Sequence, residues 1–159
     1  MRSYVITPAA GKRLIGKAIA RHPAVQAAMT SGTLVIVAGT TNGYVAEEVL
    51  GAMGESATFS RHGFYRGITL PPVRPDTAPK PADAASFPGD VVIVNGKRIQ
   101  GKTIADIADT LKEGDVIVKG ANALDLRSRR AAVLIGDTRG GTTALAMQAV
   151  VGRRVRLIV

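Results

Sequence analysis

The stretch from Thr33 to Gly54, TLVIVAGTTNGYVAEEVLGAMG, constrains the fold of this chain more than any other. Leu34 to Ala38 is a short, continuous run of apolar residues, which is typical of a buried strand. A loop of small residues, Gly39 to Gly43, follows at once. Apolar residues then recur at helical spacing, and they are Val45, Val49, Leu50 and Met53. The stretch predicts a strand, a tight loop and the start of an amphipathic helix.

Strands and helices alternate along the rest of the chain. Apolar runs at 91–94, 116–118, 132–135 and 155–159 predict four more strands, and helical spacing recurs in 8–31, 103–111 and 143–150. The runs are continuously apolar rather than alternating, which is typical of a parallel sheet covered on both faces. We therefore predict a single α/β domain over residues 1–159, a three-layer, Rossmann-like sandwich with a mainly parallel sheet.

Local signals indicate where elements begin and turn. Thr7–Pro8 is a typical helix start, because a hydroxyl can cap the first turn and proline suits its first position. Thr103 with Asp106 resembles a capping box. Asn95–Gly96 indicates a tight turn. Tyr4 to Ile6 could form a short edge strand or a docked arm.

Residues 70–90 hold six of the eight prolines, so no packed helix or strand can run through them. Because they lie within a chain of single-domain length, we expect an ordered excursion, which could cross to a neighbouring subunit. The last strand, at 155–159, has nothing after it to cover its end. Either a second copy completes it or the chain is abbreviated relative to its relatives, and we expect a homo-oligomer.

The charge of the chain favours anionic partners. The net charge is +9 and the isoelectric point lies near 10.5. Residues 1–46 contain no acid, and the part from Arg127 onward has seven arginines against one acid, Asp137. Phosphorylated metabolites, nucleotides, CoA and nucleic acid are the candidate partners, although high charge can also serve solubility alone.

Cysteine is absent and there are only two histidines, which argues against thiolate chemistry and histidine-rich metal sites. No run approaches the ~20 apolar residues that span a bilayer. The N-terminus lacks the apolar core of a signal peptide, so we expect a cytoplasmic protein without membrane partners.

Gly39-Thr40-Thr41-Asn42-Gly43 is the first candidate binding loop. A small-residue loop between a strand and a helix presents backbone N–H groups and the positive end of the helix dipole to an anion. It is neither G-x-G-x-x-G nor a P-loop, so dinucleotide and Walker-type ATP binding are not supported. The alternative is an ordinary turn in which Gly, Thr and Asn serve capping.

A second candidate loop runs from Lys119 and Gly120 to Asp125, directly after the strand at 116–118. The Asn122 amide and the Asp125 carboxylate could share a substrate, with Asp125 as hydrogen-bond acceptor or general base. The alternative is a turn in which Asn122 is left-handed and Asp125 caps the residues after it.

A third candidate loop, at 136–143, combines glycines and charge with the start of a helix. Its candidate binding residues are Asp137, Arg139, Gly140, Gly141 and Thr142. Arg139 is the best candidate for a charge-assisted contact. Ligands of open α/β sheets bind where the carboxyl ends of strands converge, so we expect the three loops to meet at one rim.

Two basic stretches lie outside these loops. FSRHGFYRG, at 59–67, could stack bases or grip phosphate, or its rings could simply pack inward from a surface loop. LRSRR, at 126–130, is more typical of a solvated face or a subunit contact.

The order of the three loops resembles the superfamily of phosphosugar isomerases, deaminases and CoA transferases, of which ribose-5-phosphate isomerase is the simplest member. The matching positions are Gly39, Thr40 and Thr41, where that family grips phosphate, and Gly120, Ala121 and Asp125 of its G-A-D-E-x-D motif of catalytic acids. Asn122 and Ala123 replace the Asp and Glu of that motif, and the family's later Glu–Lys pair has no counterpart. The resemblance covers roughly residues 10–55 and 90–159 and implies the fold and a pocket at these loops.

We therefore expect a protein that binds a sugar phosphate, a nucleotide or a CoA-type ligand at the carboxyl ends of the strands. Isomerase, hydrolase or transferase chemistry would fit such a site. One alternative is a basic nucleic-acid-binding protein. The other is a non-catalytic ligand sensor or assembly subunit. The sequence names no cofactor and no metal.

Overall fold

The computed structural model describes residues 3–66 and 87–159. A five-stranded mixed sheet has the order β3-β2-β1-β4-β7. Its strands are β1 (Thr33–Ile36), β2 (Val91–Val94), β3 (Lys97–Ile99), β4 (Val116–Val118) and β7 (Arg156–Ile158). A separate antiparallel hairpin consists of β5 (Ala123–Asp125) and β6 (Arg130–Ala132).

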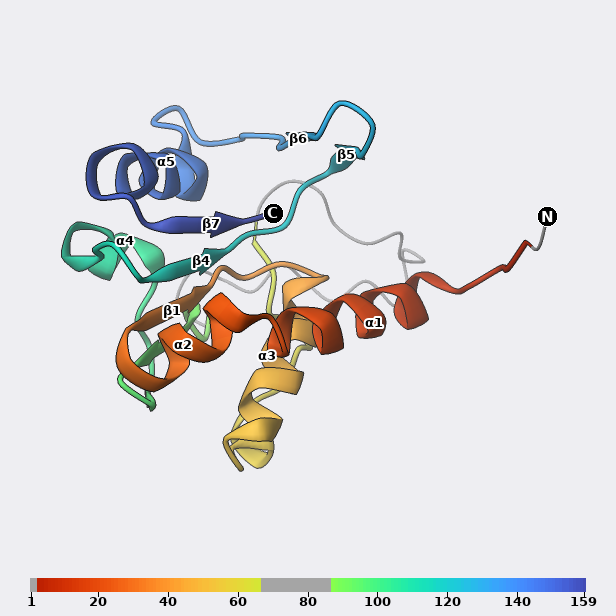
Figure 1. The fold of residues 1–159 in the computed structure, drawn as a ribbon, viewed down its shortest axis with the longest axis horizontal. Helices are drawn as coiled ribbons and strands as arrows, with labels where there is room; N and C mark the ends of the chain where they lie inside the picture. The colour runs from red at the N-terminus through yellow and green to blue at the C-terminus, as the bar shows by residue number, and fades with distance from the viewer. Residues whose placement is uncertain (1–2, 67–86) are drawn as a thin grey trace.

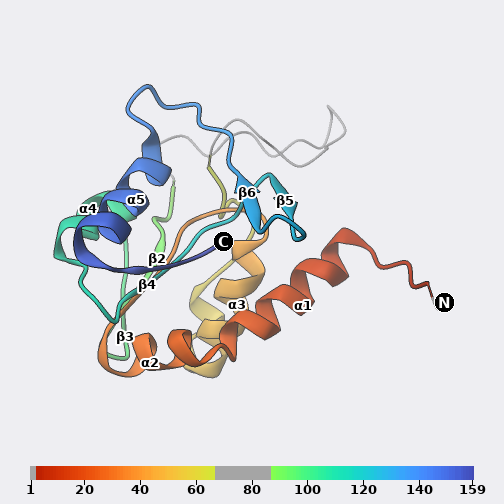
Figure 2. The same ribbon diagram turned by 45° about the horizontal axis from the view of Figure 1, so that its top comes forward.

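Helices cover both faces of the sheet (Figure 1). The helices are α1 (Pro8–Ala20), α2 (Pro23–Ser31), α3 (Asn42–Ala52), α4 (Ile104–Ile107) and α5 (Gly141–Arg153), with short 3₁₀ turns η1 (Ser56–Thr58) and η2 (Ala108–Thr110). Figure 2 shows α4 and α5 together on one side, while α1 and α3 run together on the other, and the segment before α1 extends away from the body.

The alternation of side chains along β1 divides the core into two layers. Leu34 and Ile36 pack with the apolar faces of α2 and α3, whereas Val35 and Val37 pack with α4 and α5. All four side chains are buried. Because both faces of this strand are covered, a continuous apolar run is what the strand requires. The mixed α/β class expected from the sequence is confirmed.

The expectation of a mainly parallel sheet is not met. β1, β4 and β7 run parallel, but β1 pairs antiparallel with β2, and β2 pairs antiparallel with β3. The run at 91–94 misled the prediction because Val91, Val92 and Ile93 are buried from both sides. A continuous apolar run reports burial on two faces and does not report strand direction.

Two predicted strands also differ. Residues 132–135 do not enter the main sheet, since β6 ends at Ala132 and the following apolar residues leave the hairpin. Tyr4 to Ile6 form neither a strand nor a docked arm, and the Val5 side chain is 99% exposed. Most of the proline-rich segment expected as an ordered excursion, 70–86, lies outside the described residues.

The helix-start and turn signals are confirmed. The Thr7 hydroxyl accepts a hydrogen bond from the Ala10 N–H at 3.2 Å. Thr103 and Asp106 form the capping box, although the predicted helix there is short and continues as η2. The β2–β3 turn has positive φ at both Asn95 (47°) and Gly96 (77°), as its sequence demands.

A buried aspartate ties the strands together at the edge opposite the candidate loops. The Asp115 carboxylate accepts hydrogen bonds from the Thr33 N–H at 2.7 Å and the Lys112 N–H at 2.8 Å. The Asp115 carbonyl accepts another from the Arg156 N–H at 3.0 Å. The starts of β1, β4 and β7 are thereby held in register.

Candidate binding site

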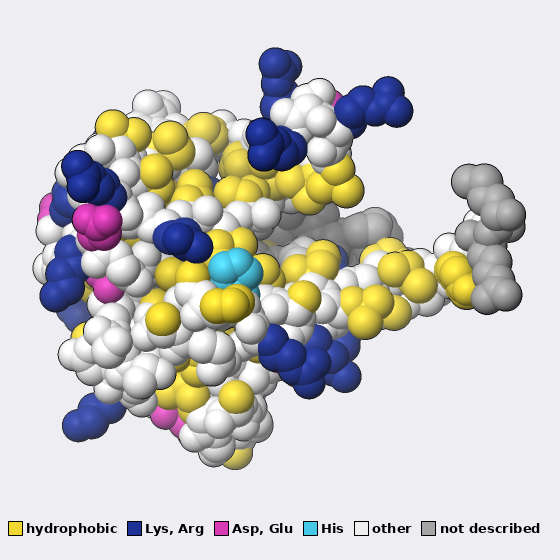
Figure 3. Space-filling model, viewed as in Figure 1, with side chains coloured by type: hydrophobic (Ala, Val, Ile, Leu, Met, Phe, Trp, Pro, Cys, Tyr) yellow, Lys and Arg dark blue, Asp and Glu magenta, His cyan; other side chains and the backbone are white. Residues whose placement is uncertain are grey.

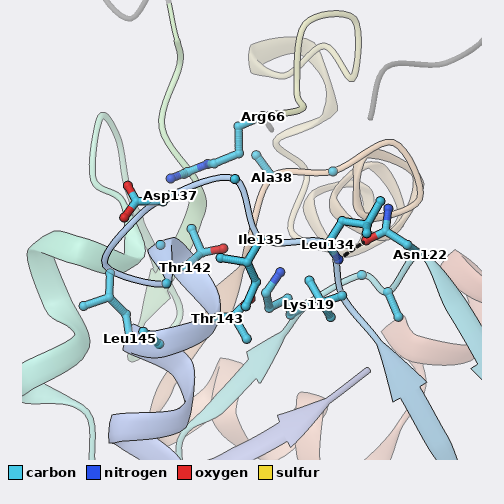
Figure 4. Close-up of a pocket in the computed structure, with 18 of the residues that line it drawn as sticks. Ala38, Arg66, Lys119, Asn122, Leu134, Ile135, Asp137, Thr142, Thr143 and Leu145 are labelled. Atoms are coloured by element: carbon cyan, nitrogen blue, oxygen red, sulfur yellow. Dashed lines mark hydrogen bonds between the residues drawn. The ribbon is translucent and has the colours of Figure 1, made fainter. Parts of the chain in front are cut away.

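A cavity of about 810 Å³ opens at the carboxyl ends of β1 and β4, where the three predicted loops meet (Figure 4). Twelve of the fourteen predicted site residues line it: Gly39, Thr40, Thr41, Asn42, Lys119, Gly120, Asn122, Asp137, Arg139, Gly140, Gly141 and Thr142. Gly43 and Asp125 do not line it. The third loop reaches the rim from the β5–β6 hairpin rather than from a strand of the main sheet.

The first loop forms one wall and leads into α3. Lys12, from α1, donates a hydrogen bond to the Thr40 hydroxyl at 2.9 Å. The loop is therefore attached to α1 as well as to α3. No side chain in the described part of the structure caps the start of α3. The backbone itself engages part of this turn, since the Gly43 N–H donates to the Gly39 carbonyl at 2.8 Å and the Tyr44 N–H to the Thr41 carbonyl at 3.0 Å. The dipole of α3 still places partial positive charge at this wall.

Asn42 holds the strand ends in place. Its side-chain amide is buried and donates to the Val37 carbonyl at 2.7 Å and to the Val118 carbonyl at 3.1 Å. These carbonyls lie beyond the end of β1 and at the end of β4. Although Asn42 lines the cavity, its amide nitrogen therefore positions the two loops and does not bind ligand.

Gly43 has a packing role. A Cβ atom at this position would lie 2.8 Å from the Cβ of Arg61, so only glycine allows that segment to pack so closely on α3. Gly43 was predicted to contact the ligand, but it does not line the cavity.

Lys119 lies directly after β4 and is half-buried. Its N–H donates to the Ile158 carbonyl at 2.9 Å, which fixes the backbone beside β7. In Figure 4 its amine points into the cavity below Arg66. Within the described ranges no hydrogen bond or ion pair holds this amine. Burial, reinforced by the positive charge of Arg66 and opposed by Asp90, lowers the pKa of Lys119.

Arg66 and Asp90 supply a second charged group at the rim. The Asp90 carboxylate is fully buried and forms an ion pair with Arg66. It also accepts hydrogen bonds from the Ala38 N–H at 2.8 Å and the Ile104 N–H at 2.7 Å. The Arg66 guanidinium stacks on the Phe87 ring at 4.4 Å and lines the cavity. Asp90 thus joins the end of β1, the start of α4 and the rim arginine.

Arg66 belongs to the stretch 59–67, for which the sequence left two roles open. The rings of Phe59 and Phe64 pack inward, edge to face, with their centres 5.0 Å apart. Arg61 pairs with Glu47 on α3 at 3.0 Å. The packing alternative is therefore right for the phenylalanines, whereas Tyr65 and Arg66 reach the cavity. Tyr65 and Arg66 were expected only as part of that stretch, and Asp90 and Lys12 were not expected at the site.

The third loop ends in the start of α5. Gly140 is left-handed, with φ of 82°, and α5 begins at Gly141. The first helical hydrogen bond runs from the Ala144 N–H to the Gly140 carbonyl at 3.1 Å. No side chain among the described residues caps this helix, so the N–H groups of the first turn face an unfilled space. Figure 4 shows the Thr142 hydroxyl on the same side as the Lys119 amine.

Asp137 and Arg139 lie at the exposed rim of this loop. The Asp137 carboxylate accepts a hydrogen bond from the Arg139 N–H at 2.7 Å, and the Asp137 carbonyl accepts one from the Gly140 N–H at 2.9 Å. Asp137 therefore shapes the turn. Among the described residues, no three acidic or histidine side chains are placed to hold a metal ion.

Asp125 does not reach the cavity. Its carboxylate accepts hydrogen bonds from the N–H groups of Arg127 at 3.0 Å and Ser128 at 3.1 Å, so it caps the tip of the β5–β6 hairpin. Hydrogen bonds from Ser128 lower the pKa of this exposed carboxyl. The turn alternative describes Asp125, and the geometry gives no support to its predicted catalytic role.

Asn122 closes the base of the hairpin. Its side-chain oxygen accepts a hydrogen bond from the Leu134 N–H at 2.9 Å, and its own N–H donates to the Ala132 carbonyl at 2.9 Å. Its backbone is not left-handed. Asn122 lines the cavity, where it fixes the stretch 133–135 that forms the opposite wall.

The arrangement suits an anion more than any other ligand. Two uncapped helix starts, the unpaired Lys119 and the rim arginines Arg66 and Arg139 face one cavity. The only acid on its lining among the described residues is Asp137. None of the helices in residues 3–66 and 87–159 has the length and apolar character that crossing a membrane requires. No family model, no curated protein and no solved structure matches this chain.

Proposed function

We propose that the cavity binds the phosphate group of a phosphorylated small molecule. One observation carries the proposal: the starts of α3 and α5, both without a side-chain cap in the described structure, line the same cavity as the unpaired Lys119. The helix dipole favours an anion at each start, the first turn of α5 adds backbone N–H donors, and a cation between the two helices adds to the attraction.

The size of the cavity favours a ligand larger than phosphate alone. Its volume of about 810 Å³ lies within the range typical of sites for metabolites and cofactors. The wall at 133–135 is apolar, so a sugar, base or acyl portion could contact it while the phosphate lies at the helix starts. The sequence resemblance to phosphosugar isomerases and CoA transferases favours a sugar phosphate, a nucleotide or a CoA-type ligand. The same resemblance favours the interpretation of this three-layer arrangement, with helices on both faces of a sheet, as a Rossmann-like sandwich.

A thermal-shift screen tests this proposal. Wild-type protein is heated with sugar phosphates, nucleotides and CoA esters, each beside its dephosphorylated counterpart. We expect a phosphorylated member to raise the midpoint by mass action, and its counterpart to leave it unchanged. Lys119→Met should weaken binding about ten- to hundredfold, because it removes a charge-assisted contact. Lys112→Met, an exposed lysine at the other end of β4, is the matched control and should bind normally.

Nucleic-acid binding is the second candidate, and one observation favours it. Arg127, Arg129 and Arg130 are exposed at the tip of the β5–β6 hairpin, and none of them forms an ion pair within the described structure. Figure 3 shows basic side chains projecting there, away from the body. A single-stranded oligonucleotide whose affinity falls steeply with salt, and that still binds Lys119→Met, would support this candidate instead.

A further inference from the structure

The surroundings of the Lys119 amine are predominantly positive. Arg66 faces it from one side, and the starts of α3 and α5 add partial positive charge. The negative charge of Asp90 favours the charged form of Lys119, but that carboxylate already binds Arg66 and two backbone N–H groups. Asp137 lies at the exposed rim.

A lysine that only stabilises a fold is normally exposed or paired with an acid. Lys119 is half-buried and, in the described part of the chain, unpaired. An arginine would hold phosphate better, through a fixed fork of donors, and would stay charged. Lysine differs from arginine in that burial beside another cation lowers its pKa and so favours the neutral, nucleophilic amine.

We propose that Lys119 forms a Schiff base with an aldehyde or ketone group of a phosphorylated substrate. The inference rests on the proposed function, in which the helix starts and the cations of the cavity, Lys119 included, attract the phosphate; the Schiff base forms from the neutral fraction of the Lys119 amine. It narrows the substrate class to phosphorylated carbonyl compounds. Lys119 follows β4, an inner strand that is paired with β1 on one side and β7 on the other. Figure 4 shows its amine directed into the cavity.

Schiff-base formation requires only the Lys119 amine and the carbonyl compound, and it releases water. The neutral amine of Lys119 adds to the carbonyl carbon, the C–N bond forms, and a proton moves from nitrogen to the carbonyl oxygen to give a carbinolamine. The hydroxyl group then leaves with the second nitrogen proton as water, and the C=N bond forms. A rise in pH speeds the addition because it increases the neutral fraction of the amine. Since the pKa of Lys119 is lowered, this increase occurs at a lower pH for Lys119 than for surface lysines.

Reductive trapping tests the inference. The intact chain is incubated with glycolaldehyde phosphate and cyanoborohydride, and the stable secondary amine is located by peptide mass spectrometry. We expect Lys119 to be modified at least tenfold faster than Lys97, Lys102 or Lys112, which are exposed. Unphosphorylated glycolaldehyde should lose this preference, and inorganic phosphate should protect Lys119 from the phosphorylated probe.

Lys119→Arg separates the amine from its charge. The variant should bind inorganic phosphate within a few-fold of wild type, measured by calorimetry, while adduct at the other lysines stays at the background rate. If wild type binds phosphate but Lys119 is trapped no faster than the exposed lysines, the Schiff base is excluded and the anion site remains. If wild type binds neither inorganic phosphate nor the phosphorylated probe, the proposed function itself fails.

Discussion

Asp90 is the residue on which the geometry of the cavity most depends. Its carboxylate has three partners at once: the rim arginine, the backbone after β1 and the first turn of α4. A carboxylate has two oxygens and can accept hydrogen bonds from all three partners. An amide has a single oxygen, and its NH₂ group would face a donor where the second carboxylate oxygen now accepts. The strand end, the helix start and Arg66 should therefore lose their relative positions together.

Asp90→Asn should lower the free energy of unfolding by about 3–5 kcal/mol, because it breaks a buried ion pair and leaves backbone donors unsatisfied. Urea denaturation measures this change. Asp109→Asn is the control, since Asp109 is exposed and its contact with Arg153 is long, at 3.7 Å. A difference of less than 1 kcal/mol between the two variants would contradict the role given to Asp90.

The affinity for inorganic phosphate should depend on pH through Lys119. The pKa of its amine is lowered by burial, so the positive charge is lost at a pH below the value of about 10.4 typical of lysine. Binding should weaken as the pH rises through this range. Lys119→Arg should remove that dependence, because arginine stays charged. Calorimetric titrations across the alkaline range would contradict this if both proteins weakened at the same pH.

At the scale of residues, the sequence identified the three loops but not all of their roles. Lys119 and Thr142 were found because they follow or begin predicted elements. Asp125 was expected at the cavity but caps the hairpin turn instead, because a sequence cannot tell a carboxylate that faces a cavity from one that caps a turn. Arg66 was covered only by the phosphate-binding alternative for the stretch 59–67, and Asp90 was missed because it precedes the strand at 91–94 rather than following a strand. Only tertiary structure brings the two residues together at the rim.

Among the elements, α5 depends on the conformation of the residue before it. A Cβ atom on Gly140 would lie 2.8 Å from the Cβ of Ala144, and its φ of 82° disfavours any other residue. The first turn of α5 points at the cavity only while this conformation is kept.

Gly140→Ala should destabilise the protein by about 1–3 kcal/mol and abolish binding of inorganic phosphate, because the loop must move to relieve the strain. Gly152→Ala is the control within the same helix, since an added Cβ there meets open space. Thermal unfolding and calorimetry measure both effects. Full phosphate affinity in Gly140→Ala would show that the start of α5 does not contribute to the site.

Element boundaries followed from local chemistry wherever a cap or turn was involved. Thr7, Thr103 and Asn95–Gly96 were predicted because their side chains or backbone preferences act within a few residues. The direction of β2 and the placement of β6 depend on distant partners. Residues 133–135 looked like a strand because they are apolar, yet that character serves the wall of the cavity.

Over the whole molecule, two groups of basic residues would bind different partners. The cavity holds Lys119, Arg66 and Arg139, and the hairpin tip holds the three arginines from 127 to 130. The homo-oligomer expected from the sequence stays a prediction, which sedimentation at several protein concentrations would test.

Replacing Arg127, Arg129 and Arg130 together by Gln should leave phosphate affinity unchanged, because the hairpin tip does not line the cavity. If the tip binds single-stranded nucleic acid, the same variant should reduce the magnitude of the slope of log affinity against log salt concentration by about 2–3. A control that removes the same charge at Arg21, Lys97 and Arg156 should keep the slope. Loss of phosphate binding in the hairpin variant would place the anion site at the tip.

We propose that the starts of α3 and α5 and the Lys119 loop form one anion site. Amide chemical shifts recorded during a titration with inorganic phosphate test it most directly, because each backbone N–H reports its own surroundings. We predict that the largest changes cluster at 40–43, 119–120 and 141–143 and share one dissociation constant. Changes concentrated at 127–130, or scattered over exposed lysines and arginines, would contradict the claim.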